Sequence, residues 1–132
     1  MRPAPALCLS LFLLASCAPK LEEVKPNTVT TPDIHSYARP AEARVEHAEL
    51  DLRVDFERRV LTGTVTHRIE GSGKLTLDTR ELAISQVECA PEGGSFAACN
   101  FQLGPADKIL GAPLEVTLPS GTRQVRVHYE TS

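Results

Sequence analysis

The chain has 132 residues, of which 42% are hydrophobic and 5% aromatic, and its 14 basic and 17 acidic side chains give a formal net charge of −3. This length and balance are typical of one modest, soluble domain. Binding to a phosphate backbone needs a strongly basic surface, and the sequence has no long run of Lys and Arg. No nucleic acid is therefore expected among the partners.

The first residues have the three-part pattern of a secretory signal, with a cation at Arg2, an apolar stretch over Ala4–Ala15 and a small-residue cleavage region. An apolar stretch of about a dozen residues is too short for a transmembrane helix, which needs roughly 20. The ending Leu14-Ala15-Ser16-Cys17 resembles a bacterial lipobox, in which cleavage precedes the Cys and its thiol is lipidated. An ordinary secretory signal that ends in Cys by chance is the alternative.

We expect residues 1–16 to be a lipoprotein signal peptide and Cys17 to carry the lipid. Acyl chains anchor a protein to a membrane without a spanning helix, because each buried methylene contributes about 0.8 kcal/mol. By resemblance to lipoprotein sorting, Ala18 predicts a lipid-anchored protein of the cell envelope, on the periplasmic face of the outer membrane. Residues 17–41 are rich in Pro and lack apolar periodicity, so they are expected to form an extended, lipidated tether.

Apolar and polar side chains alternate through residues 42–132, which predicts an all-β domain. The clearest strand is Glu46–Phe56, and the turn Glu57-Arg58-Arg59 leads into a second strand over Val60–Glu70. Gly-rich and Pro-rich turns separate the remaining strands, at 74–78, 82–89, 96–103, 114–118 and 125–129. We expect about seven strands in an antiparallel or mixed sheet or a saddle-like β-sandwich, with no helix.

Cys89 and Cys99 lie in adjacent predicted strands, equally far from Gly94 in the loop between them. In an oxidising compartment such a pair can close a disulfide, which adds about 2 to 3 kcal/mol of stability. Two small buried thiols are the alternative. Metal binding by this pair is not expected, because its spacing is wide and no His is nearby in the sequence.

No residue pattern predicts a catalytic or metal-binding site in this chain. The H-E-x-x-H motif of helical zinc sites and the G-x-S-x-G motif of Ser nucleophiles are both missing. His47 and His128 lie on the polar side of their strands and are expected in solvent, whereas His67 is expected to be half-buried and hydrogen bonded to the backbone. For Asp78 and Glu81, which share a turn, we expect an Asx-type turn or a local ion pair.

The run Asp33–Asp55, continued by FERRVLTGTVTHRIEG and KLTLDTRELAISQV, resembles the opening of gluzincin zinc aminopeptidases, peptidase family M1, in the leukotriene A4 hydrolase-like branch. The shared pieces are HSYARP before the first strand, LxVDFxxRxLxGT in the first hairpin, LxLDTRxLxIxxV, and the closing VHYETS. They occur in order over residues 33–132, with a small local insertion at 90–98.

The resemblance implies a saddle-like N-terminal β domain that packs on a thermolysin-like catalytic domain. In the family, the G-x-M-E-N motif and the zinc-binding H-E-x-x-H motif belong to that catalytic domain, so no catalytic or zinc-binding residue can be carried onto this chain. The chain is accordingly expected to be a non-catalytic fragment, without a cofactor of its own, of a zinc enzyme that removes N-terminal amino acids from peptides. Its implied partner is the missing catalytic domain of the same polypeptide, and only the full-length enzyme would bind zinc and peptides.

Two other classes of protein remain open. A stand-alone periplasmic lipoprotein could bind a partner through an exposed strand edge, which we expect at Val125–Glu130, where a truncated sheet would leave N–H and C=O groups unpaired. A purely structural β-sandwich of the cell envelope is the third interpretation.

Overall fold

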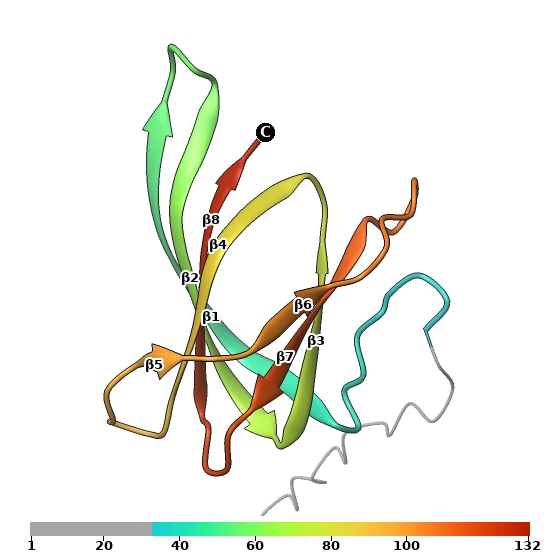
Figure 1. Cartoon of the computed structure of the whole chain (residues 1–132), viewed down its shortest axis with the longest axis vertical. Helices are drawn as coiled ribbons and strands as arrows, with labels where there is room; N and C mark the ends of the chain where they lie inside the picture. The colour runs from blue at the N-terminus through green and yellow to red at the C-terminus, as the bar shows by residue number, and fades with distance from the viewer. Residues whose placement is uncertain (1–32) are drawn as a thin grey trace, which may run out of the picture.

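The computed structural model describes residues 33–132, so the predicted signal peptide, Cys17 and most of the predicted tether lie outside the described residues (Figure 1). The described part consists of strands and connecting turns, without a helix. The strands are β1 (Ala43–Asp55), β2 (Val60–Gly71), β3 (Gly73–Thr79), β4 (Leu82–Ala90), β5 (Ala97–Ala98), β6 (Phe101–Leu103), β7 (Ala112–Leu118) and β8 (Gln124–Thr131). Residues 33–132 include no helix of the length and apolar character that a membrane span requires.

Two antiparallel sheets pack face to face. The five-stranded sheet has the order β1-β2-β8-β4-β5, and the three-stranded sheet has the order β3-β7-β6. The prediction of an all-β fold is therefore confirmed, and of the two predicted arrangements, a sheet or a sandwich, the structure has two sheets, with eight strands where about seven were expected. The core lies between the layers, and its largest fully buried side chains are Ile69, Leu75, Val87, Leu114, Val116 and Val125. Each of these aliphatic side chains contributes about 1.5 to 3 kcal/mol by leaving water.

The β1–β2 hairpin follows directly from its sequence. Period-two alternation makes both strands, and the Asp55 carboxylate accepts hydrogen bonds from the backbone N–H groups of Glu57 and Arg58, at 3.0 and 2.9 Å, in the turn. Gly63 faces the β1 backbone so closely that a Cβ there would collide with the carbonyl oxygen of Asp51. In Figure 1 this hairpin extends at the upper left beyond the three-stranded sheet.

The single strand predicted at 96–103 is wrong, because the segment divides between the two sheets. β5 pairs with β4 in the larger sheet, and β6 pairs with β7 in the smaller one. Between them, the Cys99 N–H donates to the Val87 carbonyl and the Asn100 carbonyl accepts from the Thr117 N–H, both at 2.9 Å. Alternation continues through the crossing, so the sequence pattern does not reveal it.

The predicted free edge at Val125–Glu130 is also wrong. β8 lies inside the five-stranded sheet, and Val125 is paired with His67 of β2 on one side and with Cys89 of β4 on the other. The apolar side chains Val125 and Val127 of this inserted strand are buried in the core. Within the described fold, the five-stranded sheet instead ends at β1 and at the very short β5.

Candidate functional site

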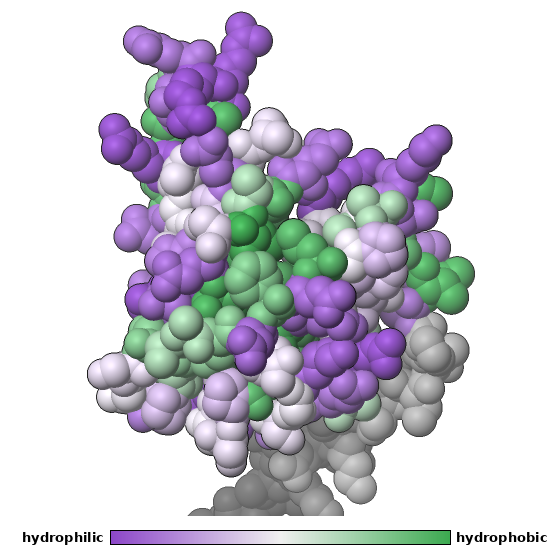
Figure 2. Space-filling model, in the orientation of Figure 1, coloured by the Kyte–Doolittle hydropathy of each residue, from purple (hydrophilic) through white to green (hydrophobic). Residues whose placement is uncertain are grey.

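An apolar groove opens between the two sheets near the connection from β3 to β4. Its volume is about 240 Å³, and residues of both sheets line it, including Leu50, Val65, Leu77, Ile84, Leu114 and Tyr129. Figure 2 shows hydrophobic side chains gathered in the middle of this face, with hydrophilic ones around them. The groove can therefore accept apolar side chains from another segment or molecule.

β1 adds a row of exposed apolar side chains beside this groove. Leu50 is 57% exposed, Val54 51% and Phe56 85%, although the strict alternation of β1 predicts that one of its faces is buried. The three-stranded sheet does not reach far enough to cover this part of the larger sheet (Figure 1). Because contiguous exposed apolar side chains are typical of binding surfaces, the row and the groove together form the candidate docking surface.

His67 is the one ionisable side chain of β2 that faces this groove. Burial lowers the pKa of His67, so the imidazole is neutral at neutral pH. Its Nδ1 atom is buried and has no hydrogen-bond partner within residues 33–132. The expected hydrogen bond to the backbone is therefore wrong, although the half-buried position is as predicted. The neutral imidazole of His67 therefore adds no charge to the groove.

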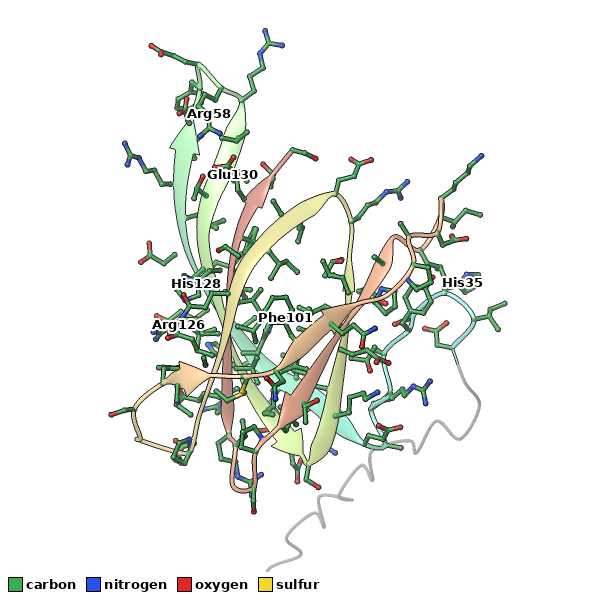
Figure 3. The ribbon with its side chains drawn as sticks, in the orientation of Figure 1. His35, Arg58, Phe101, Arg126, His128 and Glu130 are labelled. Carbon is green, nitrogen blue, oxygen red and sulfur yellow. A yellow bond between two sulfur atoms is a disulfide. The ribbon has the colours of Figure 1, made fainter. Side chains whose placement is uncertain are left out.

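A polar cluster occupies the opposite face of the five-stranded sheet, where Figure 3 shows Arg126 and His128 side by side. His128 is half-buried rather than solvated, and its Nε2 atom lies 2.8 Å from the Glu88 carboxylate. The Arg126 Nε–H donates to the Thr66 hydroxyl at 3.2 Å, and its guanidinium lies 3.7 Å from the ring centre of Phe96. The Arg126 Nη1 atom also lies 4.0 Å from the Glu88 carboxylate, so the opposite charges of the cluster compensate each other, which is consistent with a structural role.

The residues of the described part do not fit a zinc ion. A zinc site needs at least three converging His, Cys, Asp or Glu side chains, and residues 33–132 contain no such group. His128 and Glu88 are close to each other, but a third ligand is missing there. We therefore derive no catalytic step through a metal from these residues.

Asp78 attaches the segment before β1 to the end of β3. Its carboxylate accepts hydrogen bonds from the Ser36 hydroxyl at 2.6 Å and the Tyr37 N–H at 2.8 Å. The predicted local role of Asp78 and Glu81 is therefore wrong, because the partners of Asp78 are 42 and 41 residues away in sequence. The last residues of the predicted tether, from Asp33, are thus held on the domain.

Cys89 and Cys99 are joined by a disulfide, with their Cα atoms 5.7 Å apart. Cys89 lies directly opposite Ala97, so the two cysteines are diagonal neighbours rather than opposite ones. The bond ties the segment that crosses between the sheets to β4. Buried Cys89 belongs to the core, which shields the bond from solvent on this side.

The fold and the surface together define a two-sheet β domain with an uncovered apolar groove. No protein-family model matches the chain. The curated proteins that the chain is similar to are leukotriene A4 hydrolase of Xenopus laevis, 34% identical over 66% of the chain, and leucine aminopeptidase 2 of Kluyveromyces lactis, 31% identical over 81% of the chain. The match covers 14% and 16% of these two relatives.

Solved structures agree on the fold. Native leukotriene A4 hydrolase from Saccharomyces cerevisiae superposes with a TM-score of 0.65 over 82% of this chain and 18% of its own, at 24% identity. The yeast enzyme in complex with bestatin gives a TM-score of 0.67 over 82% of this chain and 17% of its own, at 23% identity. These structures show the same fold, and the sequence relatives confirm the resemblance to the M1 family, in which the chain corresponds to an N-terminal part.

Proposed function

We propose that this chain is a non-catalytic N-terminal β domain of a zinc metallo-aminopeptidase that removes N-terminal amino acids from peptides. The relatives, leukotriene A4 hydrolase and leucine aminopeptidase 2, support this class. The observation that carries the proposal is the uncovered apolar row on β1 in a chain that spans only 13% to 19% of its curated relatives. Covering such a row removes apolar area from water, at about 25 cal/mol per Å².

In this proposal the domain is a scaffold. The row on β1 and the groove beside it would pack against the remaining polypeptide, which would supply the zinc ligands and bind the peptide. The described residues contribute shape and apolar area to that contact. The neutral imidazole of His67 adds no buried charge to it.

The experiment is to follow the reading frame beyond Ser132 and to assay the product. An H-E-x-x-H motif within the next few hundred codons is expected, whereas a stop codon with stable expression of the short form would contradict the proposal. In the longer product, Leu52→Asp on the apolar face of β1 should lower aminopeptidase activity, because it places a charge in the contact. Arg53→Asp, the neighbouring position on the opposite face, is the matched control and should leave activity unchanged.

The 132-residue chain by itself provides a second measurement. It should neither bind stoichiometric zinc nor cleave aminoacyl-anilides, because the proposal assigns the zinc ligands to another part of the enzyme. Metal analysis of the purified chain after incubation with zinc, together with a chromogenic peptidase assay, tests this point. Either activity would contradict a purely scaffolding domain.

We further propose that Cys17, which lies outside the described residues, carries a lipid that anchors the protein to the periplasmic face of the outer membrane. The lipobox-like ending Leu14-Ala15-Ser16-Cys17 supports this assignment. Cys17→Ala should move the protein from the membrane fraction to the soluble fraction. An unchanged membrane fraction would contradict the lipid anchor, and Cys8→Ala in the apolar stretch is the matched control.

A stand-alone envelope lipoprotein that binds a partner is the second candidate. The observation that favours it is the edge of β1, which pairs with no further strand of residues 33–132 and takes the place of the wrongly predicted edge at Val125–Glu130. A stop codon directly after Ser132, together with a stable short product in membranes, would support this candidate over the aminopeptidase domain.

A further inference from the structure

β1 is a long sheet edge that no other described strand covers. It has 13 residues, pairs with β2 along one side and ends the five-stranded sheet on the other. The β1–β2 register is irregular only between Val45 and His47, so the segment from His47 to Asp55 is regular. Such an edge presents unpaired backbone N–H and C=O groups that can pair with another strand.

The side chains along this edge carry charges that are not used within the domain. Glu49, Asp51 and Arg53 share one face of β1, are exposed, and make no ion pair with another residue of the described range. Arg44, at the start of the same strand, instead pairs with Glu70. The unpaired charges differ in sign along the strand, so they can select both a partner and a register.

We propose that β1 pairs antiparallel with β1 of a second copy of this chain, in the register that sets Glu49 opposite Arg53 of the second copy. The two-fold symmetry of such a pair forms this ion pair twice, and it also sets His47 opposite Asp55 twice. On the other face of β1, Leu50 lies opposite Leu52 of the second copy. The exposed apolar rows of the two chains then lie side by side on one face of the joined sheet.

Neighbouring registers are disfavoured by charge. A shift by two residues in one direction sets Glu49 opposite Asp51 twice, with like charges facing each other. A shift in the other direction sets Asp51 opposite Arg53 twice but also Glu49 opposite Asp55 twice, so its attractions are offset by as many repulsions. A shift by one residue sets the charged face of one strand beside the apolar face of the other. In the proposed register, only Asp51 meets a like charge, which is its own counterpart at the two-fold axis.

The pairing depends on β1 and not on the proposed aminopeptidase function. It can be tested on the chain of 132 residues that carries Cys17→Ala, so that no lipid is attached. Analytical ultracentrifugation over a range of concentrations should show a monomer–dimer equilibrium. Glu49→Arg and Arg53→Glu should each raise the dissociation constant about tenfold or more, because two ion pairs become two repulsions. The double variant, which exchanges the two charges, should restore the dimer.

Two further variants make the test specific. Asp51→Asn should tighten the dimer, because it removes the repulsion at the two-fold axis. Arg123→Glu changes the net charge as much as Arg53→Glu does, but it lies in the turn before β8 and should have no effect. Circular dichroism checks that each variant is folded. A monomer at every concentration, or a dimer that none of the β1 substitutions affects, would overturn the proposal.

Discussion

Arg58 in the β1–β2 turn and Glu130 near the end of β8 form a bidentate ion pair across 72 residues of sequence. The guanidinium donates two hydrogen bonds to the carboxylate, at 2.7 and 3.3 Å, and the Thr62 hydroxyl donates a third at 2.9 Å. These hydrogen bonds, from Arg58 first and then Thr62, lower the pKa of Glu130. Figure 3 shows Arg58 and Glu130 at the top of the five-stranded sheet. Their ion pair links the turn of the β1–β2 hairpin to β8.

The Arg58–Glu130 pair makes stability depend on pH in a defined direction. Since the pKa of Glu130 is lower in the folded state, its stabilising effect is present above the ordinary pKa of 4.5 and is lost as the pH falls through the folded-state value. Thermal unfolding at low salt should therefore show Glu130→Gln less stable than wild type at pH 7, with the difference shrinking under acid. A difference that stays constant with pH would contradict this origin, and Glu92→Gln in the exposed β4–β5 loop is the control.

Asp78→Ala should release the segment before β1. The change removes the acceptor of two hydrogen bonds, and we expect a loss of about 1 to 2 kcal/mol in the free energy of unfolding. Hydrogen exchange should quicken at the Tyr37 N–H while the core of β7 stays protected. Glu115→Ala, which breaks only a surface ion pair with Lys74, is the control and should leave Tyr37 unchanged.

Removing the disulfide should destabilise the fold without rearranging it. The double variant Cys89→Ser with Cys99→Ser no longer constrains the unfolded chain over a separation of 10 residues, which costs about 2 to 3 kcal/mol. Urea unfolding followed by circular dichroism measures the loss. A reducing agent should lower the stability of the wild type to a similar value and have no effect on the double variant, and an equal response of both proteins would contradict the disulfide.

Gly63→Ala should weaken the pairing of β1 with β2. The new Cβ would collide with the carbonyl oxygen of Asp51, and strands held by backbone hydrogen bonds cannot separate locally at low cost, so we expect a loss of about 3 kcal/mol. Gly73→Ala is the control, because a Cβ there meets no atom and only the positive φ of 84° opposes it, at about 1 kcal/mol. Equal losses in the two variants, measured by urea unfolding, would show that close approach is not the cause.

The local features of this protein could be predicted from its amino-acid sequence. Period-two alternation predicts the strands and Glu57-Arg58-Arg59 predicts the first turn, since each depends on residues that are neighbours in sequence. The HSYARP and LDTR pieces of the family resemblance are also visible in the sequence. Their physical connection, the hydrogen bonds from Ser36 and Tyr37 to Asp78, is not.

The order of the strands and the burial of their faces come from contacts between distant segments. Alternation shows that β1 has an apolar face, but its exposure depends on how far the other sheet extends. It shows equally that β8 is a strand, but its place between β2 and β4 results from the free energy of packing the whole sheet. Pairing energies of this kind sum over residues that are far apart in sequence, so no local pattern encodes them.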